Sequence, residues 1–299
     1  MIENINTNYV LITPARNEEH YIENTINSVI CQTLLPNKWV IVNDGSTDRT
    51  ADIILKYTSR HNFIEIISVD CDRNRNFGSK AKSIKAAYNK LKNLDFDFIG
   101  NLDADVSFEP DYFENIIKQF AKNKRLGIAG GLIFDFDATN NKKLDFTKQS
   151  VSTNWSVSGA IQLFRKQCYE DIGGYVIAKR GIDAIAETMA RMHGWEVRSF
   201  SEYKVMHHRT EGTATQGILS ARLNLGVQDY ALGYSPLFEL VRCTYRSFNK
   251  PYIFGSITIL LGYILAMLRR DNIIVPDDFV NFLRQEQIGR LKNLLKKFT

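Results

Sequence analysis

The sequence predicts an α/β fold followed by a helical C-terminal region, on three observations. Over the first 135 residues, short apolar runs typical of buried strands alternate with segments that carry apolar residues at helical spacing. The connections between these segments are short, which favours parallel strand pairing with right-handed crossovers. From about Gly217 onward the chain is helical in character. We therefore expect a sheet-containing domain at 1–215 and a helical region at 216–299.

Each element follows from a local pattern. Apolar runs predict strands at residues 9–13, 39–43, 63–69, 96–102 and 161–164, and an extended segment at 196–207. Helical spacing predicts helices at residues 18–32, 46–57, 79–91, 110–120 and 183–193. The turn Ser46-Thr47-Asp48 suits a helix start, and Pro110 suits a first helical turn. The polar, irregular stretch at 135–153 predicts a loop over the edge where ligands bind in such sheets.

Composition limits the classes of function. Of the 299 residues, 44% are hydrophobic, so the chain is able to bury a core. The net charge of +5 fits an anionic small substrate or a membrane surface, and it argues against a nucleic-acid partner, which attracts more clustered charge. The four cysteines are irregularly spaced, which argues against a disulfide scaffold or a structural zinc site. The N-terminus has no secretory pattern, so we expect a cytoplasmic protein.

Acidic residues recur where the predicted strands end. Glu18 follows the first strand, Asp44 the second, and Asp103 and Asp105 the fourth. Two carboxylates one residue apart repel each other unless a cation lies between them, and Mg²⁺ and Mn²⁺ often bridge such carboxylates to phosphates. A single Asp-x-Asp is also typical of a solvated acidic turn. The buried run at 98–102 and the other acidic strand ends favour a metal-assisted site.

Three segments together carry a family resemblance. They are PARNEE from Pro14, VNDGSTDRT from Val42 and NLDADVSFEPDYF from Asn101. In this order and spacing they resemble inverting glycosyltransferases of family 2, over roughly residues 8–215. The resemblance implies the GT-A fold, a Rossmann-like mixed sheet flanked by helices. It also implies a divalent metal, Mn²⁺ or Mg²⁺, and a nucleoside diphosphate sugar, with UDP as the favoured nucleotide.

The same resemblance assigns the nucleotide-sugar site. The residues expected to bind the donor are Pro14, Ala15, Arg16, Glu18, Asp44, Lys80, Asp103, Ala104, Asp105 and Arg209. Asp44 would contact the base, Asp103 the ribose and sugar side, and Asp105 the metal on the diphosphate. Lys80 matches the lysine of a Gly-Lys-Ala segment, written here as Ser79-Lys80-Ala81. Lys82 and Lys85 lie on the same helix and also suit a solvated face.

An inverting transfer needs a base that takes the proton of the acceptor hydroxyl. The family places an acidic residue, often in a Glu-Asp pair, at the start of a helix that ends in Gly-aromatic, here Gly194-Trp195. Asp183 holds the second position of the pair, while Ile182 replaces the first. Asp183 is the expected base, and Glu187, one turn along, is the rival. Asp183 also suits a helix N-cap.

The end of the extended segment at 196–207 supplies the remaining expected ligands. By the resemblance, His207 would approach the metal, and the guanidinium of Arg209 suits the diphosphate. His208 points to the opposite face of a strand, so we expect only one of the two histidines to serve. Trp155 precedes the strand at 161–164, in a zone that touches sugar or acceptor in the family, but core packing is the favoured interpretation.

The C-terminal region suggests a membrane surface. Residues 251–268 carry no charge, and as a helix they span about 27 Å, marginal for a hydrocarbon layer of about 30 Å. Basic residues on both sides favour a helix in the interface over a membrane-spanning one, with a core helix as the alternative. The tail from Arg284 to Thr299 reads as a basic amphipathic helix suited to an anionic leaflet.

We therefore expect an enzyme at the inner face of the cell membrane. Its acceptor would be a lipid-linked saccharide or a cell-surface polysaccharide. Two alternatives stay open. A nucleotidyltransferase also combines an α/β sheet with metal carboxylates, but PARNEE lacks the glycine-rich basic loop such an enzyme needs after its first strand. A noncatalytic membrane-surface scaffold would keep the fold without the activity.

Overall fold

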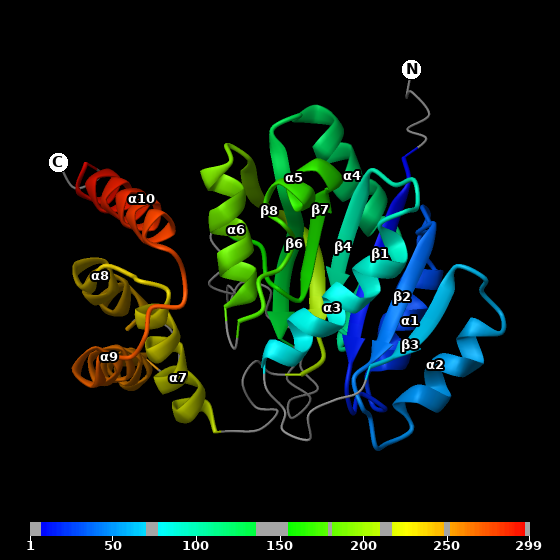
Figure 1. Cartoon of the computed structure of the whole chain (residues 1–299), viewed down its shortest axis with the longest axis horizontal. Coiled ribbons are helices and arrows are strands. Elements are labelled where there is room, and N and C mark those ends of the chain that lie inside the picture. Colours follow the sequence, from blue (N-terminus) through cyan, green and yellow to red (C-terminus); the bar gives the residue numbers. More distant parts are fainter. Residues whose placement is uncertain are drawn as a thin grey trace. The chain divides into compact units, whose positions relative to one another are not determined.

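The computed structural model describes residues 7–69, 77–135, 155–178, 181–209, 217–247 and 252–296. The chain divides into two compact units, Met1–Thr210 and Glu211–Thr299. The first combines a sheet with helices, and the second contains helices (Figure 1). Most of the loop expected at 135–153 lies outside the described residues, as does Pro251.

The first unit is built on one mixed sheet. Its strands are β1 (Tyr9–Ala15), β2 (Lys38–Asn43), β3 (Ile64–Ser68), β4 (Phe98–Leu102), β5 (Val106–Phe108), β6 (Leu126–Asp135), β7 (Ile161–Arg165) and β8 (Glu196–His207). Their order in the sheet is β3-β2-β1-β4-β7-β6-β8-β5. The pairs among β1 to β4 are parallel, as is β6 with β8. In contrast, β7 is antiparallel to both of its neighbours, and β5 is antiparallel to β8.

The parallel pairing predicted from the strand-helix alternation is confirmed for the first four strands, and the sheet as a whole is mixed, as the family resemblance implies. β5 and β6 were not anticipated as strands at all. β5 begins at Val106, directly after the acidic turn that follows β4, with no crossover helix between them. Because no crossover helix returns the chain to the side of β4, β5 does not pair with β4. It pairs instead with β8, which comes last among the strands in the sequence.

Helices cover both faces of this sheet (Figure 1). They are α1 (Ile22–Ile30), α2 (Thr50–Thr58), α3 (Phe77–Leu91), α4 (Tyr112–Lys122), α5 (Lys166–Asp171) and α6 (Ile182–Met192). Side chains alternate along β1, so that Leu11 packs in a core cluster with α1, α2 and α4, while Ile12 packs in a second cluster with α3, α5 and α6. Burial on both faces explains why the strands read as continuous apolar runs.

This arrangement fixes where the acidic strand ends lie. β1 pairs in parallel with both β2 and β4, with Ala15 opposite Asn43 and Ile12 opposite Asn101. The carboxyl ends of the three strands therefore meet at one edge of the sheet. All five residues of β4 are buried, so the turn that begins at Asp103 follows a strand that packing holds in place.

The second unit contains four helices within its described residues, α7 (Ile218–Ala231), α8 (Pro236–Arg246), α9 (Tyr252–Arg269) and α10 (Asp277–Leu295). α7 and α9 approach closely because each has a glycine at the contact. A Cβ at Gly226 would lie 1.9 Å from the carbonyl oxygen of Ile259, and one at Gly262 would lie 2.0 Å from that of Leu223. No helix in these segments is both long and apolar enough to cross a membrane.

Polar contacts also join the helices of the second unit. Arg242 of α8 forms ion pairs with Asp229 of α7 and with Glu239 on its own helix. Arg284 of α10 donates from Nε to the carbonyl oxygen of Gly233, 2.9 Å away. Arg284, expected as part of a basic amphipathic tail, thus fastens α10 to the turn that follows α7.

Candidate active site

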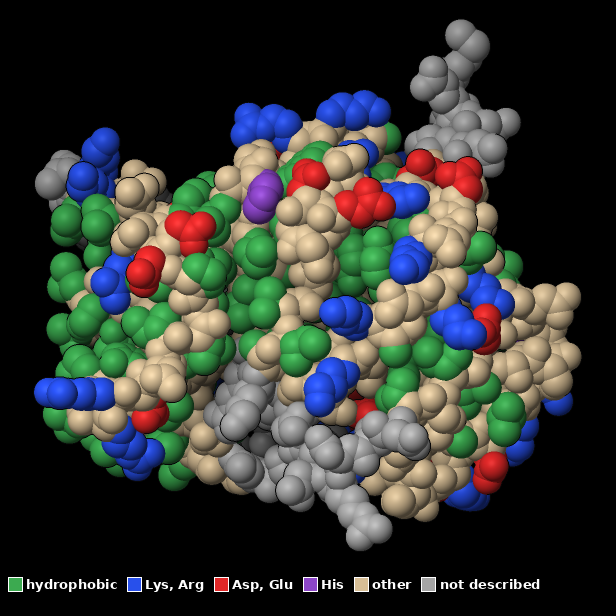
Figure 2. Space-filling view, viewed as in Figure 1, with side chains coloured by type: hydrophobic (Ala, Val, Ile, Leu, Met, Phe, Trp, Pro, Cys, Tyr) green, Lys and Arg blue, Asp and Glu red, His purple; other side chains and the backbone are tan. Residues whose placement is uncertain are grey.

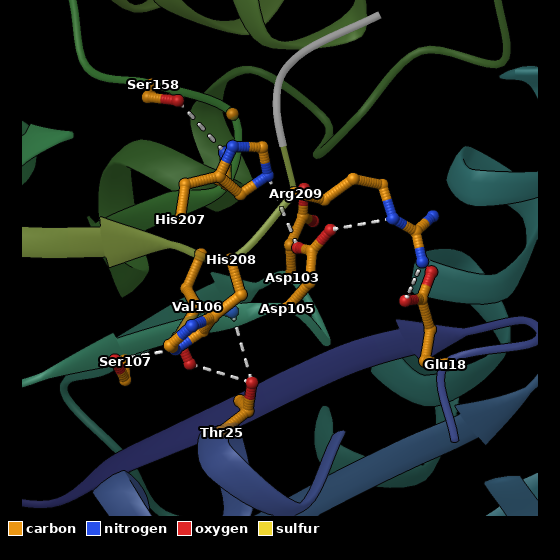
Figure 3. Close-up of polar contacts among 12 residues, drawn as sticks. Glu18, Thr25, Asp103, Asp105, Val106, Ser107, Ser158, His207, His208 and Arg209 are labelled. Atoms are coloured by element: carbon orange, nitrogen blue, oxygen red, sulfur yellow. Dashed lines mark hydrogen bonds and ion pairs between the residues drawn. The ribbon is translucent and has the colours of Figure 1, made fainter. Parts of the chain in front are cut away.

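Charged side chains from four separate segments meet at the carboxyl edge of the sheet. Asp103 and Asp105 follow β4, Glu18 follows β1, and Arg209 follows β8. Figure 3 shows Asp105 between His207 and Arg209, with Glu18 beyond the guanidinium. The fourth segment is α3, whose Lys80 reaches Asp103. The structure therefore brings together residues that are as much as 191 positions apart in the sequence.

Lys80 and Asp103 form a close ion pair. Lys80 Nζ lies 2.5 Å from Asp103 Oδ1 and 3.3 Å from the carbonyl oxygen of Gly159. Burial would lower the pKa of Lys80, but the surrounding carboxylates, above all Asp103, raise it above its usual value. Burial raises the pKa of Asp103 even though Lys80 opposes the shift. Lys80 is therefore a fixed cation at the site.

Asp105 has the opposite electrostatic environment. His207 Nε2 lies 3.5 Å from one carboxylate oxygen of Asp105, and Arg209 Nε lies 3.9 Å from the other. Burial would raise the pKa of Asp105, but its interactions with His207 and Arg209 outweigh burial, and the pKa is lowered. Asp105 therefore stays ionised, as a metal-binding carboxylate must.

Arg209 connects the segment that follows β8 to the segment that follows β1. Its Nη2 lies 2.5 Å from Glu18 Oε2, and its guanidinium carbon lies 5.1 Å from the ring centre of Tyr21. The adjacent histidines diverge, as the alternation along a strand predicts. His207 faces Asp105, while His208 Nε2 lies 2.8 Å from Ser107 Oγ.

The residues expected at the nucleoside lie at the ends of β1 and β2. Ser79 Oγ donates to Asp44 Oδ2 over 2.5 Å, and the amide of Asp44 donates to the carbonyl oxygen of Ala15. Arg16 Nη1 is buried and finds no hydrogen-bond partner within the described residues. Such an unsatisfied guanidinium nitrogen is suited to a ligand that carries acceptor oxygens.

Two of the residues expected to bind the donor have buried side chains. Ala15 and Ala104 are buried in the hydrophobic core, with exposed fractions of 1% and 3%. Each is next in sequence to residues that face the edge, because side-chain direction changes from one residue to the next. Pro14 is half-buried. These positions shape the backbone of the site rather than the surface that touches a ligand.

Asp183 lies beside the Lys80 pair. It occupies the first turn of α6, whose N-cap is Gly181 in a left-handed conformation with φ of 68°, so the N-cap alternative for Asp183 is wrong. A Cβ at Gly159 would lie only 2.9 Å from Asp183 Oδ2. Gly159 therefore lets the carboxylate of Asp183 approach the segment whose carbonyl oxygen contacts Lys80.

Glu187 lies in a different environment, one turn further along α6. It is buried, and its Oε1 accepts hydrogen bonds from the amide of Val157 at 2.6 Å and from Gln162 Nε2 at 3.2 Å. Burial raises the pKa of Glu187 to about 7. The carboxylate of Glu187 is therefore enclosed by the segment before β7 and by β7 itself, to which these two hydrogen bonds connect it.

Several residues of the site carried no signal in the sequence. Asn101 Nδ2 donates to the carbonyl oxygen of Gly159 over 2.8 Å, and Tyr175 donates its hydroxyl proton to Gln162 Oε1 over 2.5 Å. Both contacts fix the segment between Asp183 and Lys80. Of the residues that were not predicted, Ser79 was the easiest to find from the sequence, because it is next to Lys80 in the motif.

Three other expectations concerned single side chains. Trp155 is 67% exposed, so the expectation that it packs in the core is wrong. Its place at the surface leaves the ring free to contact a ligand. Lys82 and Lys85 are exposed on α3, in keeping with a solvated face. Of these three neighbouring lysines, Lys80 contacts the acidic turn.

The donor set suits a hard divalent cation held with help from a substrate. Within the part of the chain that the structure describes, no group of three or more His, Cys, Asp or Glu side chains is arranged to hold a metal ion. Asp105 and His207 form a pair, and carboxylate oxygen with imidazole nitrogen is a combination that Mn²⁺ accepts. Mn²⁺ and Mg²⁺ commonly complete so small a set with phosphate oxygens and water.

Sequence comparison finds known relatives of this chain. The family model of glycosyl transferase family 2 matches residues 10–181. A poly-β-1,6-N-acetyl-D-glucosamine synthase from Staphylococcus epidermidis is 26% identical over 208 residues, which are 64% of this chain and 45% of the relative. The chain therefore spans less than half of that relative. A chondroitin synthase from Pasteurella multocida is 34% identical over 113 residues, 38% of this chain and 11% of the relative.

Solved structures share the fold. A mannosyltransferase from Pyrobaculum calidifontis, in complex with GDP-Man and Mn²⁺, has a TM-score of 0.57 at 18% identity and covers 97% of this chain and 82% of its own. TarS from S. aureus, residues 1–349 in complex with UDP, has a TM-score of 0.53 at 15% identity over 73% of this chain and 65% of its own. The mixed sheet with its flanking helices is thus the GT-A fold.

Proposed function

The chain belongs to glycosyl transferase family 2, and we propose that it is a metal-dependent inverting enzyme that moves a sugar from a nucleoside diphosphate sugar to a hydroxyl acceptor. One observation carries the proposal. A carboxylate kept ionised, Asp105, lies beside the fixed cations Lys80 and Arg209 at the sheet edge where nucleotides bind in α/β folds. Opposite charges held this close in a buried turn suit a diphosphate and its metal.

The donor would lie across the ends of β1, β2 and β4. Asp44 and Arg16 are placed for the nucleoside, and Asp103 for the ribose and sugar side. Lys80 and Arg209 would bind the diphosphate oxygens, where fixed positive charge stabilises the negative charge that develops as the diphosphate leaves. The solved mannosyltransferase and TarS structures contain GDP-Man and UDP, and we favour a UDP-sugar for this chain.

Asp105 and His207 would hold the metal. Their donor atoms fit Mn²⁺ or Mg²⁺, and the diphosphate would supply further ligands. When bound, the cation supplies additional positive charge to the leaving diphosphate. Asp105 is suited to this role because its lowered pKa keeps the carboxylate ionised over the whole neutral range.

Asp183 is the proposed general base. It would take the proton from the acceptor hydroxyl while the acceptor oxygen forms its bond to the anomeric carbon and the bond from that carbon to the diphosphate breaks. A single displacement of this kind inverts the anomeric configuration and needs one base only. The support is positional, because Asp183 is half-buried next to Gly159 and Lys80.

We place the acceptor at a membrane, as a lipid-linked saccharide or a growing surface polysaccharide. The relatives named as poly-N-acetylglucosamine and chondroitin synthases support a polysaccharide product. The second unit supports the membrane, because residues 211–299 contain eleven Lys and Arg residues against seven Asp and Glu residues. The enzyme would then be peripheral at the inner face of the cell membrane.

A donor screen tests the proposal. The full chain is incubated with UDP-, GDP- and dTDP-sugars in the presence of Mn²⁺, and release of nucleoside diphosphate is measured, with Asp183→Asn as the matched control. One donor class should be cleaved, and EDTA should abolish the release. Release of pyrophosphate from a nucleoside triphosphate with a sugar phosphate would instead indicate a nucleotidyltransferase. Failure to bind UDP, GDP or dTDP in calorimetry would indicate a noncatalytic scaffold.

A further inference from the structure

Exposed hydrophobic side chains are concentrated in the second unit. Of the 22 large hydrophobic residues that are exposed in the described segments, six lie in the first unit and 16 in the second. Figure 2 shows hydrophobic side chains gathered over this part of the surface. Scattered exposed hydrophobic residues are ordinary on a soluble domain, but a contiguous set marks a surface that contacts something apolar.

The set is most regular on α9. Phe254, Ile257, Leu261, Leu265 and Leu268 are all exposed, by 76%, 48%, 49%, 36% and 72%, and follow one another at intervals of three or four residues. This spacing places them on one side of the helix. We call this set the α9 apolar face.

The opposite side of α9 is already occupied. Ile259, Tyr263 and Ala266 are buried, and Gly262 sits against the backbone of α7. The contacts with α7 involve only this side of the helix. The α9 apolar face therefore has no partner among the described residues of its own unit.

The charges around the face indicate what covers it. Arg269 and Arg270 are exposed at its C-terminal end, and the whole second unit carries a net charge of +4. A second copy of this chain would bring like charges together. A bilayer with anionic lipids offers hydrocarbon to the face and negative charge to its basic border.

We propose that the α9 apolar face inserts into the surface of an anionic membrane, with α9 lying parallel to the bilayer plane and Arg269 and Arg270 at the headgroups. The inference deepens the proposed membrane location of the enzyme by naming the surface that makes the contact. The catalytic unit would then be held at the surface where a lipid-linked acceptor is presented.

Vesicle sedimentation of the full chain tests the proposal. Vesicles of phosphatidylcholine with about 30% phosphatidylglycerol should bind the protein, and pure phosphatidylcholine should bind it more weakly. Leu261→Glu with Leu265→Glu should lower binding to both kinds of vesicle by about tenfold or more, because charge is placed in the apolar contact. Arg269→Gln with Arg270→Gln should lower binding to the anionic vesicles alone, by about 25-fold.

The matched control is Leu55→Glu on α2, a residue of the first unit that is 51% exposed. It should leave vesicle binding unchanged. A second measurement uses Phe254→Trp, whose fluorescence should shift to shorter wavelength when anionic vesicles are added. Tryptophan preserves the apolar surface, so this variant keeps the fold.

Three outcomes would overturn the proposal. In the first, the variant with Leu261→Glu and Leu265→Glu binds vesicles as the wild type does. In the second, the emission of the Phe254→Trp variant stays unshifted. In the third, the wild type forms a discrete oligomer that dissociates in the Leu261→Glu, Leu265→Glu variant, which would assign the face to a second copy. Nucleotide binding is measured on every variant. Retained nucleotide binding without vesicle binding defeats this inference alone, whereas a wild type that binds vesicles but no nucleotide defeats the proposed function alone.

Discussion

Two carboxylates on one helix, Asp183 and Glu187, lie in different surroundings although they share one chemical group. Both lie on the same side of α6, one turn apart. Asp183 is half-buried at the start of the helix, beside Gly159 and Lys80. Glu187 is buried against the segment before β7 and is already engaged by the amide of Val157. Two carboxylates of similar chemistry, one turn apart, thus differ in how far a substrate could reach them, and on this difference we base the proposed roles.

The largest expected effect contrasts these two residues directly. Asp183→Asn should lower kcat by about 10²- to 10⁴-fold, because the variant cannot accept the proton of the acceptor. Glu187→Gln should lower kcat far less, since an amide oxygen still accepts the hydrogen bond from Val157. Steady-state transfer with a saturating donor measures both. A larger loss for Glu187→Gln than for Asp183→Asn would reverse the roles.

The next effect sharpens the contrast between the charged edge of the sheet and the buried Glu187. Asp105→Asn removes the carboxylate that we propose binds the metal, so activity at a fixed Mn²⁺ concentration should fall about 100-fold. A Mn²⁺ titration should show that higher metal concentration restores part of the activity. The exposed Lys82 provides the control, and Lys82→Gln should leave the titration unchanged. Equal curves for Asp105→Asn and wild type would remove Asp105 from the metal site.

A smaller effect comes from Gly159, which lies against Asp183 and contacts Lys80 through its carbonyl oxygen. Gly159→Ala would place a Cβ 2.9 Å from Asp183 Oδ2, and the displaced carboxylate should lower kcat by about tenfold. KM for the donor should change little if only the base moves. Gly217→Ala is the matched control, because a Cβ there meets no heavy atom within 4 Å. An unchanged kcat would show that the position of Asp183 is not limiting.

The last effect concerns stability instead of activity. The pKa of Glu187 is raised to about 7 in the folded chain from an ordinary 4.5, so the unfolded chain ionises first as pH rises. Below about pH 4.5 the titration of Glu187 therefore leaves the free energy of unfolding unchanged. Between about pH 4.5 and 7 it lowers that free energy progressively, and above pH 7 the total loss relative to low pH is about 3 kcal/mol.

Glu187→Gln removes this titration. Relative to the wild type, the variant should gain free energy of unfolding as pH rises from about 4 to about 8, measured by urea denaturation at each pH. Asp183 and Arg191, the charged neighbours of Glu187, are present in both proteins and largely cancel in the difference. A difference that stays constant with pH would show that Glu187 is not buried as described.

The expectations failed where a partner lay far away in the chain. Trp155 was expected in the core because tryptophans are usually buried, and nothing local indicates that this one is exposed. β5 was missed because it is three residues long and pairs with β8, about 100 residues later. The direction of β7 was not predicted, since strand direction depends on which neighbours a strand finds and not on its own residues.

Residues close together in the chain were enough to predict the first four strands and their parallel pairing, the acidic turns, and the resemblance to family 2. Three contacts became visible only in the folded chain: Lys80 with Asp103, Arg209 with Glu18, and Glu187 with the amide of Val157. The tertiary structure also left one side of α9 exposed. These outcomes depend on burial and on distances between remote segments, which hydrophobic periodicity and motif spacing do not encode.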